Sequence, residues 1–224
     1  GGVSSSSLGP AEVLRGFDKF EDKDKIEIDF LIAPESISNS TATTVVNDLV
    51  ATASSLRKDC VAVASPSRNA AVVTGTNAAV IACGNTYTKG SYLVQDNNYL
   101  KVYDKYNDQF IKIPAASSTA GLMAATDLVA ANWFSPAGQR RGRYLGITDI
   151  VLTPTKTERD ELYKVGINPI ANIPGEGIML FGDKTNESRP SAFDRINVRR
   201  LFLGIERAIA LAGRNVMFEF NDEF

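Results

Sequence analysis

The spacing of hydrophobic residues predicts a strand, a helix and a second strand in the first third of the chain. Residues 25–33 alternate at first and then become continuously apolar, as expected for a strand that enters a covered sheet. Residues 41–58 have apolar positions at helical spacing, namely Val45, Leu49, Ala53 and Leu56. Residues 60–64 form a short apolar run. This order favours a parallel α/β arrangement.

The middle of the chain predicts a hairpin followed by a helix. Residues 99–103 and 109–113 alternate and flank a polar segment, which is typical of two antiparallel strands. Ser117 or Ser118 is expected to cap a helix that runs to about Asn132. Residues 68–84 are rich in Ala, Val and Asn and give no firm expectation.

A second unit is expected after a loop rich in glycine and arginine at 135–146. Thr155 and Glu158 form a capping-box pattern for a short helix that ends near Gly166. Further on, the pattern predicts a strand at 178–181, a helix at 197–212 stopped by Gly213, and a final strand at 216–220. We therefore expect two units, residues 1–146 and 147–224.

Composition narrows the classes of function. The 224 residues are 44% hydrophobic and 22% charged, with 24 basic against 26 acidic residues. A net charge of -2 argues against direct binding of nucleic acid through a basic surface. No apolar run approaches the ~20 residues that span a bilayer, so we expect no membrane insertion.

The chain contains no histidine. This excludes a Ser-His-Asp or Cys-His nucleophile pair and any histidine-ligated zinc. Cys60 and Cys83 each lie among small apolar residues, which predicts buried, reduced thiols. We expect no catalytic residues, no metal and no cofactor.

A near match to a phosphate-binding loop leaves an enzyme as the alternative. Residues 177–185 resemble G-x-x-x-x-G-K-[ST], but Asp183 stands beside the second glycine and the intervening residues are large and apolar. We interpret this segment as a strand that ends in a glycine turn. A nucleotide-binding α/β enzyme remains the competing hypothesis.

Two groups of arginines are candidate contact residues. Arg140, Arg141 and Arg143 lie in one loop and suit an acidic surface on a neighbouring subunit, or simple solvation. A second group lies off the apolar stripe of the 197–212 helix, where a docking face and an ordinary charged face are both possible. Its members are Arg199, Arg200 and Arg207.

Three segments together resemble the contractile tail sheath proteins of bacteriophages, especially the T-even-like type. The first is residues 113–127, a proline–serine turn and helix that ends at Asp127. The second is residues 133–142, with the sequence WFSPAGQRRG. The third runs from residue 160 to 222 and includes GINPI, FGDKT, NVRRLF and FEFND. The resemblance covers about residue 25 to the end.

The resemblance implies a fold and a function. It implies an α/β chain of mixed sheets flanked by helices, with part of a subtilisin-like α/β domain followed by an α+β C-terminal sheath domain. Such subunits form stacked hexameric rings around a tail tube and contract to drive the tube through the host envelope. The implied partners are further copies of the subunit, the tail tube protein, and the baseplate and tail terminator proteins. The implied location is the virion tail, with the host cytoplasm during assembly; a related bacterial contractile injection machine is the alternative.

The resemblance also suggests roles for particular residues. Arg199, Arg200 and Arg207, together with Arg140, Arg141 and Arg143, become candidate contacts with the tube or with neighbouring subunits. A strand shared between subunits is expected at Glu219, Phe220 and Asn221. Both ends look cut, so we expect the chain to be a fragment that lacks terminal arms.

Overall fold

A parallel sheet lies at the centre of the protein, which was analysed as a computed structural model that describes residues 9–214 and 216–218. Its strands are β1 (Phe30–Ile32), β2 (Val61–Ala64), β3 (Leu93–Asp96) and β7 (Ile167–Asn168), in the order β1-β2-β3-β7. Every residue of β2 and β3 is buried. Strands covered on both faces read as continuous apolar runs, as residues 60–64 do.

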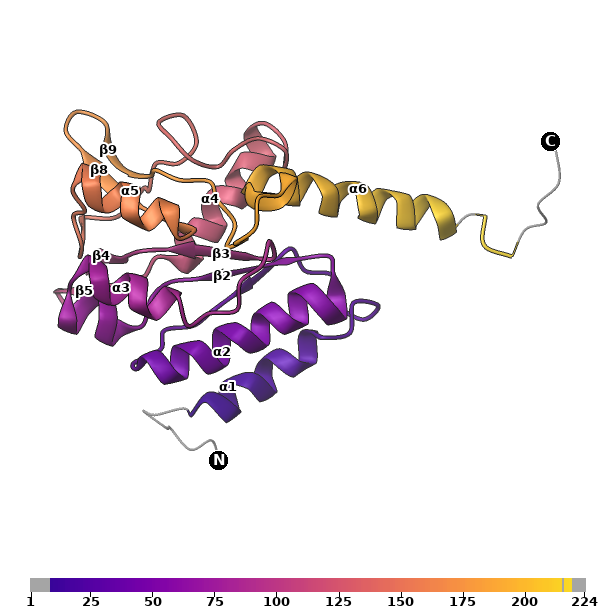
Figure 1. Cartoon of the computed structure of the whole chain (residues 1–224), viewed down its shortest axis with the longest axis horizontal. Coiled ribbons are helices and arrows are strands. Elements are labelled where there is room, and N and C mark those ends of the chain that lie inside the picture. Colours follow the sequence, from indigo (N-terminus) through magenta and orange to yellow (C-terminus); the bar gives the residue numbers. More distant parts are fainter. Residues whose placement is uncertain (1–8, 215, 219–224) are drawn as a thin grey trace.

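Helices cover both faces of this sheet (Figure 1). On one face lies α2 (Asn39–Ala51), which continues as a π-helix to Arg57 and has α1 (Pro10–Phe17) packed outside it. On the other face lie α4 (Ala116–Val129) and the first turns of α6 (Ile196–Arg214). Two further helices, α3 (Asn77–Gly84) and α5 (Lys156–Lys164), contact each other beside the sheet.

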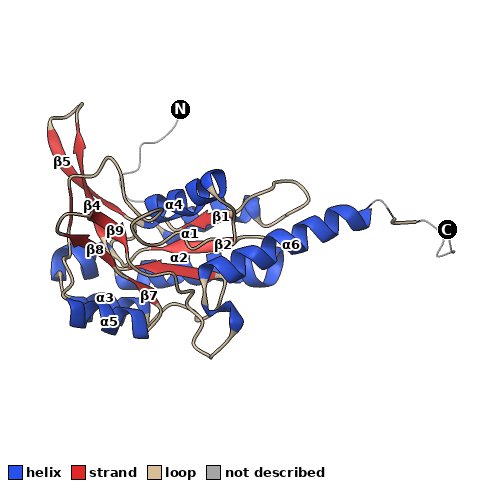
Figure 2. Ribbon diagram, turned by 90° about the horizontal axis from the view of Figure 1, so that it is seen from above, coloured by secondary structure: helices blue, strands red, loops and turns tan. Residues whose placement is uncertain are grey.

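Two antiparallel sheets adjoin the parallel one. The first has the order β5-β4-β6 and consists of β4 (Tyr99–Asp104), β5 (Gln109–Pro114) and β6 (Asp149–Ile150). The second pairs β8 (Ile170–Ile173) with β9 (Gly177–Leu180). Buried residues of both sheets form one core cluster. The β4–β5 hairpin extends from the body of the molecule (Figure 2).

The predicted mixed α/β class is confirmed, and so are several elements. The hairpin, the strand at β9 and the capping box between Thr155 and Glu158 are all present. Both cysteines are buried free thiols, and burial raises the pKa of the Cys60 thiol to about 12. The first strand is shorter than predicted, since only residues 30–32 of 25–33 are extended in the sheet.

Three details of the prediction are wrong. Ser117 and Ser118 lie inside α4 and do not cap it; the hydroxyl oxygen of Ser65, at the end of β2, accepts the Ala116 N–H at 2.8 Å instead. Gly213 lies within α6, which continues to Arg214. Residues 216–218 form a turn and not a strand, and residues 219–220 of that predicted strand lie outside the described residues.

Strands from both predicted units share sheets. Strand β7 pairs with β3, and β6 pairs with β4. The boundary between residues 146 and 147 remains a prediction. Within residues 9–214 and 216–218, no helix is long and apolar enough to cross a membrane.

The arginine-containing loop 137–144 packs so closely on itself that only glycine fits at position 142. A Cβ added at Gly142 would lie 2.7 Å from the Gly138 nitrogen and 2.9 Å from the Ala137 carbonyl carbon, both backbone atoms. Gly142→Ala should therefore lower the free energy of unfolding by about 1–3 kcal/mol, as measured by urea denaturation. Gly121→Ala is the matched control, because nothing lies within 4 Å of its Cβ. Alanine inside α4 should add up to about 1 kcal/mol, and equal effects at both positions would contradict the packing argument.

Candidate interaction surfaces

The carboxyl edge of the parallel sheet is closed by polar side chains. Open α/β sheets bind ligands at this edge. Here Ser65 follows β2, Asp96 ends β3, and both are buried beneath Thr119 of α4 and Tyr144. Asp96 accepts hydrogen bonds from the hydroxyls of Ser65 at 2.8 Å and Thr119 at 3.2 Å, and the Thr119 and Tyr144 hydroxyls are 2.9 Å apart. The side chains bind one another and fill the edge.

Asp96 is a buried carboxyl group whose hydrogen-bond donors are all neutral. Burial raises its pKa to about 7, and the hydrogen bonds from Ser65, the Asn98 N–H and Thr119 offset part of that rise. A lone carboxylate in a closed site can suggest catalysis. This one is fully enclosed and bonded to structural hydroxyls, so we assign it to the fold. Across the described residues, no group of three or more potential metal ligands was found.

Two buried arginines anchor the first turns of α6 to the body of the protein. Arg199 donates to the Ser91 hydroxyl at 2.5 and 3.1 Å, and its guanidinium lies 4.3 Å from the Tyr92 ring centroid and 4.0 Å from that of Phe193. Arg200 pairs with Asp127, donates to the Met123 carbonyl at 3.2 Å and lies over the ring of Phe30. Only 8% and 6% of their surfaces are exposed.

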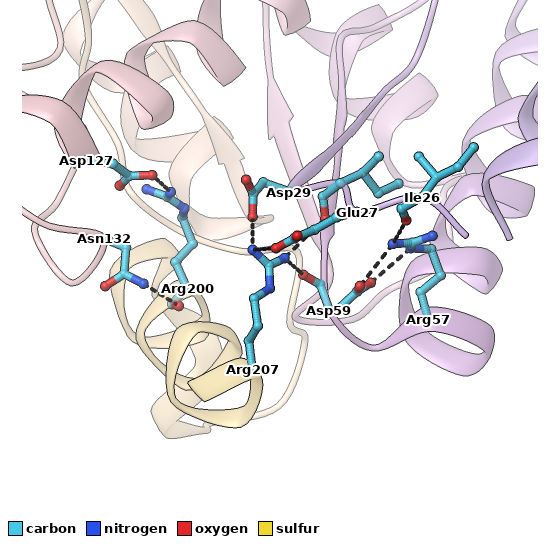
Figure 3. Close-up of polar contacts among 10 residues, drawn as sticks. Ile26, Glu27, Asp29, Arg57, Asp59, Asp127, Asn132, Arg200 and Arg207 are labelled. Atoms are coloured by element: carbon cyan, nitrogen blue, oxygen red, sulfur yellow. Dashed lines mark hydrogen bonds and ion pairs between the residues drawn. The ribbon is translucent and has the colours of Figure 1, made fainter. Parts of the chain in front are cut away.

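Further along α6, Arg207 holds the helix to the segment before β1 (Figure 3). Its guanidinium lies 2.9 Å from Asp29 and 3.1 Å from Glu27, and it donates to the backbone carbonyls of Ile28 and Asp59. Arg57 reinforces the same segment, since it pairs with both carboxylate oxygens of Asp59 and donates to two carbonyls of residues 20 and 26. Residues 208–214 are all exposed, and α6 extends away from the body (Figure 1).

The exposure expected for the arginines of α6 is therefore wrong for Arg199 and Arg200. A docking face and an ordinary charged face both need these side chains at the surface. Instead Arg199 and Arg200 face inward, while a large part of the stripe is exposed. The exposed members are Phe202, Ile205 and Ile209. Periodicity identified two faces of the helix, but the aromatic rings and carboxylates that receive the arginines come from distant segments and left no local signal.

The other candidate group remains at the surface. Arg140 and Arg143 are exposed, while Arg141 is half-buried, donates to the Ser135 carbonyl at 2.7 Å and lies over the ring of Phe134. Neither Arg140 nor Arg143 has an ion-pair partner within the described residues. Backbone hydrogen bonds to β9 anchor the loop. The predicted strand residues Glu219, Phe220 and Asn221 lie outside the described part of the chain.

The near match to a phosphate loop has a structural explanation. Residues 177–180 are strand β9, as predicted. The Asp183 carboxylate accepts hydrogen bonds from the Arg195 guanidinium at 2.7 Å and from the Tyr163 hydroxyl at 3.1 Å. A carboxylate thus occupies the place where a phosphate loop needs a cation.

Comparison with known proteins gives a consistent set of relatives. A model of the family described as phage tail sheath protein central domain matches residues 7–186. The tail sheath proteins of Vibrio phage KVP40 and Enterobacteria phage T4 are each 36% identical to this chain; the alignments cover 100% of it and 36% of each relative. The chain thus spans about a third of the length of these relatives.

Solved structures share the fold. The contracted helical sheath of the anti-feeding prophage superimposes with a TM-score of 0.72 at 22% identity, covering 99% of this chain and 55% of that one. A sheath tail protein from Listeria innocua gives a TM-score of 0.63 at 12% identity, covering 96% and 44%.

The pH dependence of stability should report on Asp96. Its folded pKa of about 7 exceeds the ordinary value of 3.8, so the folded protein binds more protons between these values. Stability should therefore be highest at the acidic end of that window and fall as pH rises to 7, by up to about 4 kcal/mol. Asp96→Asn should remove most of this fall in denaturation series at pH 5 to 8. Asp104→Asn, at a half-buried carboxyl whose pKa is lowered by hydrogen bonds, should leave it in place; an unchanged slope in Asp96→Asn would contradict the assignment.

Arg200 and Arg140 should differ sharply in their effect on stability. Arg200→Ala removes a buried guanidinium with carboxylate, carbonyl and aromatic contacts, and should cost about 2–3 kcal/mol. Arg140→Ala changes an exposed side chain and should stay within about 0.5 kcal/mol. Thermal and urea unfolding of both variants would measure this. Similar losses of unfolding free energy in the two variants would mean that Arg200 does not anchor α6.

Proposed function

The chain belongs to the phage tail sheath family, and from that premise we propose that it is part of a subunit of a contractile tail sheath. The observation that carries the proposal is the family match over residues 7–186, together with 36% identity to two phage sheath proteins along the whole chain. In this proposal, copies stack as hexameric rings around a tail tube, and the sheath contracts to drive the tube through the host envelope. Its partners are further copies, the tube protein, and the baseplate and tail terminator proteins.

Contraction in this proposal needs packing energy and no chemical step. Rigid subunits that can adopt two sets of interfaces store free energy in the less stable set. The closed carboxyl edge around Asp96 suits such a rigid body, and we propose that the chain is not an enzyme. Its place is the virion tail, after assembly in the host cytoplasm. The sheath of a bacterial contractile injection machine is the second candidate, supported by the fold it shares with the anti-feeding prophage sheath.

Residue roles within the sheath follow from exposure. Arg140 and Arg143 are proposed as contacts with a neighbouring subunit, because a fixed loop presents them without an ion-pair partner in the described part of the chain. Tube contacts at Arg199, Arg200 and Arg207 remain a prediction, and the burial of the first two weighs against it. The division at residue 146 and the shared strand at 219–221 also remain predictions.

Electron microscopy of a purified polypeptide that contains this chain tests the proposal. We expect tubes or rings with a central lumen. Arg140→Glu/Arg143→Glu should shorten or abolish the tubes, because it reverses the charge of the loop. Lys156→Glu/Lys164→Glu on α5 is a control with the same change of charge at exposed positions. Dispersed particles from the unaltered polypeptide would contradict the sheath proposal, and normal tubes from the arginine variant would remove the loop from the interface.

A further inference from the structure

One face of the projecting β4–β5 hairpin combines aromatic rings with a pair of opposed lysines. Tyr103 and Phe110 are cross-strand partners with ring centroids 5.4 Å apart, and 48% and 54% of their surfaces are exposed. The next pair on the same face is Lys101 opposite Lys112. Half-exposed aromatic rings beside basic side chains are typical of contact surfaces.

The two lysines lie directly opposite each other on neighbouring strands. Like charges placed directly opposite in an antiparallel pair are destabilising. Lys101 lies over the Phe110 ring at 4.9 Å, and neither lysine forms an ion pair within the described residues. Asp149 is the partner of Lys101 on β6; its carboxylate accepts from the Ile150 N–H and forms no ion pair with Lys101 among the described residues.

The carboxylates at the tip of the hairpin accept hydrogen bonds from neutral groups of the hairpin itself. Asp108 accepts from the Tyr103 hydroxyl at 2.6 Å, and Asp104 from the Asn107 amide and the Tyr106 N–H. The hairpin therefore carries these two carboxylates at its tip and the two opposed lysines nearer its base.

Two acidic residues form a negatively charged pair at the ends of α1 and α2. Asp18 directly follows α1, and Asp48 is in the last turn of α2. The pKa of Asp48 is raised, mainly by burial and also by the nearby charge of Asp18. Asp18 is exposed, Asp48 is half-buried, and neither has an ion-pair partner among the residues described.

The topology places the Lys101–Lys112 pair and the Asp18–Asp48 pair at opposite edges of the parallel sheet. Helix α2 returns from the carboxyl end of β1 to the amino end of β2, so its last turn lies near the amino edge of the sheet. The hairpin follows the carboxyl end of β3, and β5 leads into Ala116 beside Ser65. Figure 1 shows β5 at the left end of the molecule, whereas α6 and the segment it holds lie toward the right.

We propose that the Lys101–Lys112 face of one copy docks on the Asp18–Asp48 pair of a second copy. The contact neutralises two repulsive pairs at once and covers the Tyr103 and Phe110 rings. Because it joins different surfaces, it is heterologous, and repetition gives a ring or a helix. The inference rests on the proposed sheath function and names one interface within it.

Sedimentation velocity of the 224-residue chain at low salt tests the contact by charge exchange. The wild type should associate with increasing concentration and dissociate as salt is added. Lys101→Glu/Lys112→Glu and Asp18→Lys/Asp48→Lys should each raise the dissociation constant about tenfold or more. An equimolar mixture of the two variants should regain association, because each supplies the surface that the other lacks. Lys156→Glu/Lys164→Glu, with the same change in charge, should behave as wild type.

Loss of folding can be separated from loss of contact. Each variant exchanges one like-charged pair for another of the opposite sign, so urea unfolding of each variant is measured beside the wild type and association is compared between folded samples. The wild type gives an independent readout: a carbodiimide should join Lys101 or Lys112 to Asp18 or Asp48 between copies, recognised as mixed-isotope peptides from equal ¹⁴N and ¹⁵N protein. A wild type that stays monomeric, association that survives both variants, or oligomers without these cross-links would each overturn the proposal.

The sheath proposal and this contact fail in different ways. Tubes with a lumen that form equally well from the charge-exchange variants would remove the contact and leave the sheath. Rescue in the mixed sample without any tubes from the longer polypeptide would support the contact and count against the sheath.

Discussion

The structure depends on the junction that Ser65 and Asp96 make at the carboxyl edge of the parallel sheet. The Ser65 hydroxyl donates to Asp96 and accepts from the first N–H of α4, so one side chain joins two strands to a helix. Asp96 in turn holds Thr119, and Thr119 lies in hydrogen-bonding distance of Tyr144. Burial of an ionisable group is costly unless it is bonded, and here the bonds fix the relative positions of the sheet, α4 and the loop before β6. The edge where a related topology would bind a ligand instead becomes part of the core.

Helix α6 is held by a separate set of contacts. Its first turns are held by arginines that stack on aromatic rings and pair with Asp127, and a large part of its apolar stripe is exposed. Arginine suits this role because its planar guanidinium stacks on rings and donates in several directions at once. Such an anchor fixes the direction in which the exposed half of the helix leaves the body. In an assembly built from rigid subunits, a fixed direction of that kind determines what the free half of the helix can reach.

The family assignment and the physical description agree on what kind of protein this is. Its closed sheet edge, and the exposed charged side chains that lack an ion-pair partner within the described residues, are features suited to contacts with other proteins. The chain covers about a third of the length of these relatives, so the assembly of a whole sheath is a proposal that goes beyond these residues. Within these 224 residues, the rigid body and its exposed surfaces are the features that experiments can examine.

The sequence by itself determined the elements with strong local signals. It gave the buried strand at 60–64, the hairpin, the capping box at Thr155 and the buried thiols, because periodicity, turn composition and capping act within a few residues. Only the tertiary structure decided which face of α6 is inside, that Ser65 caps α4 from 51 positions away, and that β7 completes the first sheet. Those outcomes depend on partners far apart along the chain. Their energies are set by packing and charge pairing in three dimensions, so no local pattern could contain them.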